Sequence, residues 1–69
     1  MRPRCQSLTD REREILALIA DGLTHYAIAR RLKLTQTAVS HYVTRIFRKL
    51  GAVNAPNAVA LAMRGGMLK

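Results

Sequence analysis

The stretch THYAIARRLKLTQTAVSHYVTRIFRKL, residues 24–50, contains two runs of helical periodicity joined by a very short connection. In the first run, residues 25–32, Ile28 and Leu32 recur at helical spacing and define an inward stripe. Thr24 stands directly before this run and is a residue type that caps a helix start. The stretch therefore predicts a short first helix that ends just before a tight turn.

The second run is longer, and both of its ends carry boundary signals. Thr35 caps the predicted helix from about Gln36 to Leu50, and Gly51 follows as a residue suited to the left-handed turn after a helix. Four apolar residues inside it recur at spacings of four, three and four, which is the pattern of one buried helix face. These are Val39, Val43, Ile46 and Leu50.

The opposite side of this second helix is polar along its whole length, with short polar groups first and cations after them. A short helix, a three-residue turn at residues 33–35 and a longer polar-faced helix form the helix-turn-helix pattern. In that pattern the first helix braces the second, whose exposed half can enter a DNA major groove. The polar side consists of Thr37, Ser40, His41, Thr44, Arg45 and Arg48.

One further helix is expected on each side of this pair. Thr9 and Glu12 form the spacing of a capping box before an apolar run that ends at residues 21–22. A fourth helix begins near Asn54, with Pro56 in its first turn and two glycines at residues 65–66 as its end. The sequence predicts an all-α, four-helix domain over residues 7–69, preceded by a flexible arm over residues 1–6.

Charge divides this chain of 69 residues unevenly. The four acidic residues all precede Gly22, whereas eight of the twelve basic residues follow it, so the net charge of +8 comes from residues 22–69. A basic field of one sign attracts polyanions and drives their binding through counterion release. Charge therefore favours a polyanionic partner over a merely solubilising role.

Several other classes of protein fit poorly. The chain has one cysteine, Cys5, and two histidines, His25 and His41, which is too few for a structural zinc site. It carries no paired carboxylates after Asp21 and no glycine-rich phosphate loop, so we expect no enzyme, cofactor or small-molecule ligand. No apolar run is long enough to span a bilayer, and no secretion signal opens the chain. We expect a cytoplasmic protein without a membrane partner.

The spacing of residues across all four predicted helices resembles the LuxR/GerE-type helix-turn-helix domain, which is also found in FixJ- and NarL-like regulators. The resemblance covers about residues 7–64, and the chain is similar in size to small free-standing members. The resemblance implies a four-helix bundle, DNA binding as a transcription regulator and dimerisation through the last helix. It is carried by Leu8-Thr9-x-Arg11-Glu12-x-Glu14-Ile15-Leu16, Ile19-Ala20-x-Gly22-Leu23-Thr24, Ile28-Ala29-x-x-Leu32, Thr35-x-x-x-Val39, Ile46-x-x-Lys49-Leu50-Gly51 and Asn54-x-x-x-Ala58-Val59.

Residues on the outward face of the predicted helix from Gln36 to Leu50 are the candidates for DNA contact. The alternative for each of them is that it only belongs to the solvated side of a helix and contacts no DNA. We expect base-edge contacts from residues on successive turns, partly because relatives use the positions of Ser40, His41 and Thr44 in this way. The expected base contacts are Thr37, Ser40, His41 and Thr44. The expected phosphate contacts are Lys33, Thr35, Arg45, Arg48 and Lys49.

The last helix is expected to form a homodimer, since its small residues let a partner helix approach closely. The predicted interface consists of Ala55, Ala58, Val59, Ala62 and Met63. Of the aromatic residues, Tyr26 and Phe47 are expected to be partly buried in the core or an interface. Tyr42 is expected to pack sideways, or else to place its hydroxyl near the DNA backbone.

The chain also departs from the usual family pattern. The positions that commonly read Thr-Val-Lys-x-His are Ala38, Val39, Ser40, His41 and Tyr42 here, and Ala27 and Ala55 replace the usual Glu and Arg. These departures motivate an alternative function, a protein-interaction module that pairs with a larger regulator or another protein and modulates it. The leading hypothesis remains a sequence-specific regulator that binds double-stranded DNA.

Overall fold

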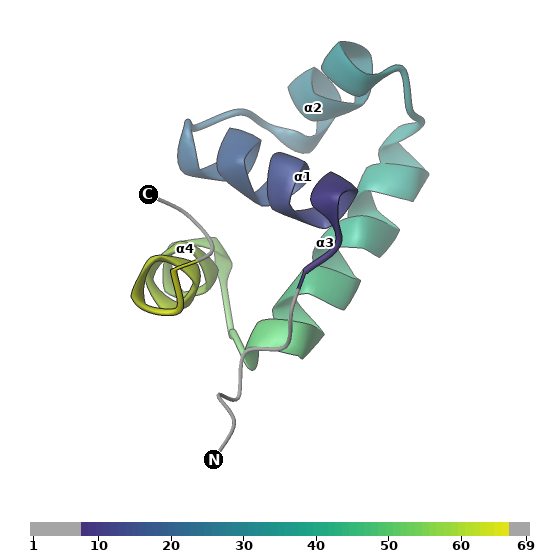
Figure 1. The fold of residues 1–69 in the computed structure, drawn as a ribbon. Helices are drawn as coiled ribbons and strands as arrows, with labels where there is room; N and C mark the ends of the chain where they lie inside the picture. The colour runs from purple at the N-terminus through teal and green to yellow at the C-terminus, as the bar shows by residue number, and fades with distance from the viewer. Residues whose placement is uncertain (1–7, 67–69) are drawn as a thin grey trace.

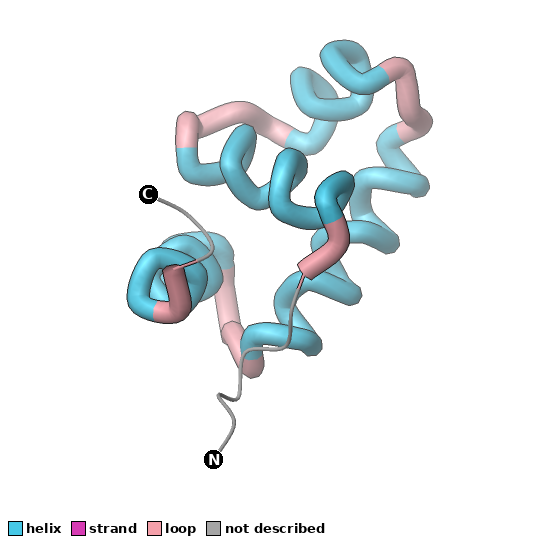
Figure 2. The backbone as a smooth tube through the Cα atoms, viewed as in Figure 1, coloured by secondary structure: helices cyan, strands magenta, loops and turns pink. Residues whose placement is uncertain are grey.

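The computed structural model describes residues 8–66, and this part of the chain contains four α-helices and no strand (Figures 1 and 2). The all-α fold class is confirmed, and the bounds of α2 and α3 are those predicted. The predicted arm at residues 1–6 lies outside the described residues. The helices are α1 (Asp10–Ala20), α2 (His25–Leu32), α3 (Gln36–Leu50) and α4 (Ala55–Arg64).

The two central helices are α1 and α3, each of which packs against the other three helices, whereas α2 and α4 do not touch. Figure 1 shows α2 and α4 on opposite sides of α1, with α3 running past all of them. The core between the helices is apolar and contains one buried acid, Glu12. Its fully or almost fully buried apolar residues are Leu8, Ile15, Leu16, Ile28, Ala29, Val39, Val43, Ile46, Leu50, Ala58 and Ala62.

Each helix begins at a side chain that accepts a hydrogen bond from the first turn. The predicted capping box of α1 is present, since the Glu12 amide donates to Thr9 Oγ1 at 3.1 Å and the Thr9 amide donates to Glu12 Oε1 at 3.0 Å. Thr24, Thr35 and Asn54 cap the other three helices. These caps satisfy amide groups that have no partner within a helix, so the turns between helices can be short.

The turn between α2 and α3 depends on a left-handed residue. Lys33 has φ 60°, and it is the only non-glycine residue with positive φ among the described residues 8–66. This conformation sends the chain back, so the Leu34 amide donates to the Ala29 carbonyl at 2.8 Å. Leu34 then packs against the core as a partly buried residue. The turn thereby sets the angle at which α3 leaves α2.

The aromatic residues divide differently from the prediction. Tyr42 and Phe47 on α3 pack against the core as partly buried residues. Tyr26 on α2 does not, because 56 % of it is exposed, so it is not a core residue and its expected place in an interface stays a prediction. Its ring instead lies beside Arg30 one turn later, with the guanidinium carbon 5.8 Å from the ring centre.

No helix within residues 8–66 has the length and apolar character needed to cross a membrane.

Candidate nucleic-acid interface

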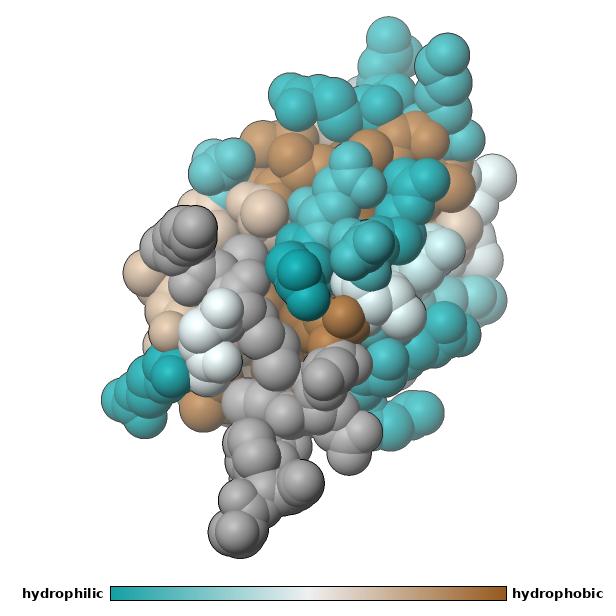
Figure 3. All heavy atoms as spheres, viewed as in Figure 1, coloured by the Kyte–Doolittle hydropathy of each residue, from teal (hydrophilic) through white to brown (hydrophobic). Residues whose placement is uncertain are grey.

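The side of α3 that faces away from the core forms the candidate interface. Because Val39, Val43 and Ile46 are buried, the rotation of α3 is fixed and its polar stripe faces outward. In Figure 3 hydrophilic side chains lie along the edges of the molecule over α2 and α3, and also in the middle of this face over α1. The four predicted base-contact residues are all exposed on α3: Thr37, Ser40, His41 and Thr44.

The first turn of α3 offers hydrogen-bond donors to an anion. Thr35 Oγ1 accepts a hydrogen bond from the Ala38 amide at 3.0 Å, which leaves the hydroxyl proton of Thr35 free to be donated outward. The first turn contains no acidic side chain. Lys33, two residues before the cap, is exposed and adds a cation at the same end of α3. Donors and positive charge at a helix start favour a phosphate group.

Cations dominate the second half of the outward face. Arg45 and Arg48 are both exposed, and the Arg45 guanidinium carbon lies 6.0 Å from the centre of the Tyr42 ring. Tyr42 therefore supports Arg45 from the side while packing against the core itself. The face runs from short neutral polar groups at the start of α3 to arginines near its end.

Lys49 differs from its neighbours on α3. Its Nζ lies 2.8 Å from Oε1 of Glu12 on α1, and the Glu12 side chain is only 1 % exposed. Lys49 itself is partly buried, with 27 % of its side chain exposed. The structure thus gives Lys49 a partner inside the chain, and its predicted phosphate contact stays a prediction. Helical periodicity offered no signal for this pair, because the two residues are 37 positions apart.

The Glu12 carboxyl group is kept ionised by its surroundings. Burial by itself would raise the pKa of Glu12, because it disfavours the charged form. The hydrogen bond from Lys49, the hydrogen bonds with Thr9 and the positive charge of Lys49 together outweigh this effect and hold the pKa below its ordinary value. Glu12 is therefore both part of the cap of α1 and the buried counter-charge of Lys49.

The predicted interface on α4 is only partly available at the surface. Ala58 and Ala62 are fully buried within the chain, so their assignment to a dimer interface is wrong. Their small size lets α4 pack closely in its own fold instead. Met63 is 51 % exposed, whereas Ala55 and Val59 are half-buried.

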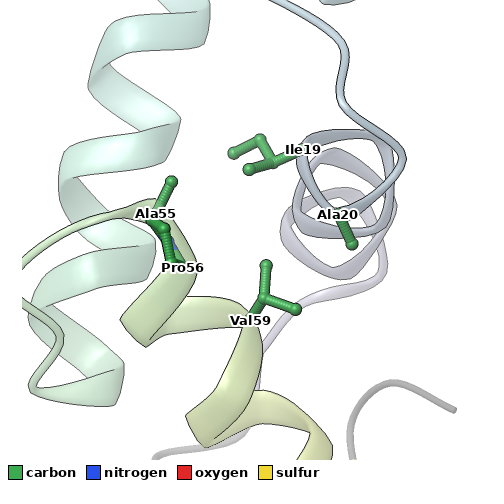
Figure 4. Close-up of a pocket in the computed structure, with 5 residues that line it drawn as sticks. All are labelled: Ile19, Ala20, Ala55, Pro56 and Val59. Carbon is green, nitrogen blue, oxygen red and sulfur yellow. The ribbon is translucent and has the colours of Figure 1, made fainter.

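Ala55 and Val59 border an open apolar groove of about 390 Å³. Its walls come from the end of α1 and the start of α4, and Val59 points toward the last turn of α1 (Figure 4). An open groove without charged lining residues is a surface on which another apolar side chain can be seated. The lining residues are Ile19, Ala20, Ala55, Pro56 and Val59.

A short brace helix, a left-handed turn and a long helix with a polar outward face define a helix-turn-helix domain. The model of the family described as "Bacterial regulatory proteins, luxR family" matches residues 6–62. The chain therefore belongs to the LuxR family of bacterial regulatory proteins. The matched family and the relatives below are transcription regulators rather than enzymes.

Two curated relatives show the degree of similarity. The chain is 43 % identical over 56 residues to the probable transcriptional regulatory protein SgaR of Hyphomicrobium methylovorum, covering 81 % of this chain and 26 % of SgaR. It is 42 % identical over 55 residues to the DNA-binding transcriptional activator DevR/DosR of Mycobacterium tuberculosis, covering 80 % of this chain and 25 % of the activator. The chain thus spans about a quarter of the length of these relatives.

Solved structures agree with the family assignment. The transcription factor GerE superposes with a TM-score of 0.84 at 29 % identity, covering 99 % of this chain and 97 % of GerE. The response regulator ChrA of a heme-sensing two-component system superposes with a TM-score of 0.86 at 32 % identity. That match covers 96 % of this chain and 32 % of ChrA. The four-helix LuxR-type fold is therefore confirmed.

Proposed function

We propose that the chain is a cytoplasmic transcription regulator that binds double-stranded DNA with sequence preference, with α3 in the major groove. The observation that carries this proposal is the outward face of α3, which is polar throughout and contains no acid. A relative that is 42 % identical over 55 residues bears the description of a DNA-binding transcriptional activator. The major groove is wide enough to admit an α-helix.

Sequence preference would come from the short polar residues. Ser40, His41 and Thr44 lie on adjacent turns of α3, where their side chains can donate to or accept from base edges. Thr37, one turn before His41, extends the same stripe toward the helix start. Short side chains such as these require a close approach of the helix to the bases, and the exposed stripe permits it.

Affinity would come from the flanking cations and donors. Arg45 and Arg48 at the end of α3, and Lys33 and Thr35 before its start, would contact phosphates on either side of the groove. Such contacts fix the register of the helix on the duplex but carry no sequence information themselves. They also make binding depend strongly on salt.

A dimer through α4 is the second part of the proposal. Met63 is exposed and Ala55 and Val59 border the apolar groove, so the start and the outer side of α4 offer an apolar surface to a second copy of the chain. Two copies related by a two-fold axis would bind two half-sites about one helical turn of DNA apart. Dimerisation would then double the number of base contacts.

Contrasting substitutions in α3 test the proposed docking. His41→Ala is expected to change which duplex is preferred, whereas Arg48→Ala is expected to weaken binding to every duplex and reduce the salt slope by about 0.9. Arg13→Ala, at an exposed position on α1, is the matched control and should change neither quantity. If both α3 variants bind all duplexes as the parent chain does, the docking of α3 is wrong.

A further inference from the structure

One carboxylate oxygen joins the start of α1 to the last turn of α3. Oε1 of Glu12 accepts hydrogen bonds from the Thr9 amide at 3.0 Å and from Lys49 Nζ at 2.8 Å. Lys49 directly precedes Leu50, which is 2 % exposed, and directly follows Arg48, which is exposed. The last turn of α3, which Glu12 holds through Lys49, therefore contains both the core residue Leu50 and the proposed phosphate contact Arg48.

A buried carboxylate needs its counter-charge, so this contact is more demanding than a surface ion pair. Removing one member of a buried pair leaves an uncompensated charge, whereas removing both leaves none. Helix α1, which contains Glu12, also has an ion pair at its surface that can be compared with the buried one. Arg11 and Glu14 lie 3.8 Å apart, with side chains that are 42 % and 53 % exposed, and such pairs contribute little.

We propose that Glu12 is a positioning residue for DNA recognition: by holding Lys49, it sets the orientation of the second half of α3 and keeps Lys49 away from the phosphates. The inference rests on the proposed function. Arg48 neighbours Lys49, and Arg45 lies one turn earlier, so a shift of this turn moves both arginines relative to the DNA backbone. Phosphate contacts fix where α3 lies on the duplex, so a shift of the two arginines also moves the base-contacting side chains of α3 relative to the bases.

The substitution Glu12→Gln separates this role from helix capping. Glutamine keeps an oxygen that accepts from the Thr9 amide, as in other capping boxes, but it removes the charge opposite Lys49. Lys49→Met removes the partner, and the double variant removes both. Glu14→Gln makes the same change in the exposed pair of α1 and is the matched control. All variants are compared at a temperature at which circular dichroism shows each of them to be fully folded.

The readout is affinity for a duplex selected from a random pool and for a scrambled duplex, titrated across salt. Glu12→Gln is expected to lower the ratio of the two affinities about two- to thirty-fold, the range for residues that act on a distant site. The double variant recovers part of this loss, and Glu14→Gln changes nothing. Lys49→Met leaves the salt slope at the parent value, although Arg48→Ala lowers it by about 0.9.

An unchanged affinity ratio in fully folded Glu12→Gln overturns the positioning role. A salt slope lowered by about 0.9 in Lys49→Met overturns it as well, because Lys49 would then contact a phosphate. A parent chain that binds both duplexes equally refutes the proposed function instead. In that case the free energies of unfolding of the two single variants and the double variant give the coupling energy between Glu12 and Lys49. A coupling energy that persists when the chain has no sequence preference identifies the pair as purely structural.

Discussion

Lys49 Nζ lies 2.8 Å from Glu12 Oε1, so the end of α3 is tied to the capped start of α1. The folded chain holds the pKa of Glu12 below its ordinary value. At a given acidic pH the folded state therefore binds fewer protons at Glu12 than the unfolded state does. The stabilisation is complete above the ordinary glutamate pKa of about 4.3 and is lost as the pH falls through the lower folded value.

We therefore expect Glu12→Gln to remove part of the acid sensitivity of the fold. The free energy of unfolding, measured by urea denaturation at a series of pH values, should fall less steeply below about pH 4.5 in Glu12→Gln than in the parent chain. At neutral pH the variant should be less stable than the parent chain, because Lys49 loses its charged partner. Parallel curves for the two proteins over the acid range would contradict the assigned pKa shift.

The left-handed turn before α3 predicts a stabilising substitution. Lys33 has φ 60°, a conformation that costs an ordinary residue about 1 kcal/mol and glycine nothing. Lys33→Gly should raise the free energy of unfolding by up to about 0.5 kcal/mol, because the greater freedom of glycine in the unfolded chain offsets part of the cost that is removed. Lys33→Ala removes the same charge but keeps the conformational cost, so it serves as the control. Equal stability of the two variants would show that the turn is not under this constraint.

Thr35 is predicted to have two separable roles, one in the cap of α3 and one at the phosphate backbone. Thr35→Ala should lower stability by about 1 kcal/mol through loss of the cap. Thr35→Asp keeps the cap and suits the helix dipole, so its stability should stay near that of the parent chain. Its negative charge would nevertheless repel DNA, and titrations should show weaker binding to every duplex. Undiminished affinity in Thr35→Asp would remove Thr35 from the interface.

How much of this architecture is readable from the sequence depends on the range of the interaction. The bounds of α3 were predictable, since Thr35, the stripe of buried residues and Gly51 act within one helix. The Glu12–Lys49 pair was not, because periodicity does not report which side chains meet from different helices. The exposure of Tyr26 could have been predicted, because Ile28 and Leu32 mark the inward side of α2 and Tyr26, two residues before Ile28, lies on the opposite side.

The outward face of α3 was correctly placed for the same local reason. Once Val39, Val43 and Ile46 are buried, residues such as His41 and Thr44 must be exposed. The small residues of α4 predicted its contacts less well than the apolar stripe predicted those of α3. A small side chain permits close approach of any helix, and the burial of Ala58 and Ala62 shows that the approaching helices belong to the same chain.

A charge on the exposed side of α4 should prevent the proposed dimer without unfolding the chain. Met63→Glu puts a carboxylate on an exposed apolar position, and light scattering across concentration should report the mass of one 7.7 kDa chain. Arg64→Glu places the same side chain about 100° further around the helix and should leave the association intact. A parent chain that stays monomeric at all concentrations, with and without DNA, would exclude the dimer.

The most direct test of the central claim is selection of a binding site from a random duplex pool, followed by salt titrations of the winner and of a scrambled duplex. If α3 reads base edges, the winner should bind at least about a thousandfold more tightly than the scramble, as specific regulators do. The spacing of its half-sites would report the dimer. Equal, weak and steeply salt-dependent binding to both duplexes would contradict sequence recognition and favour a protein partner instead.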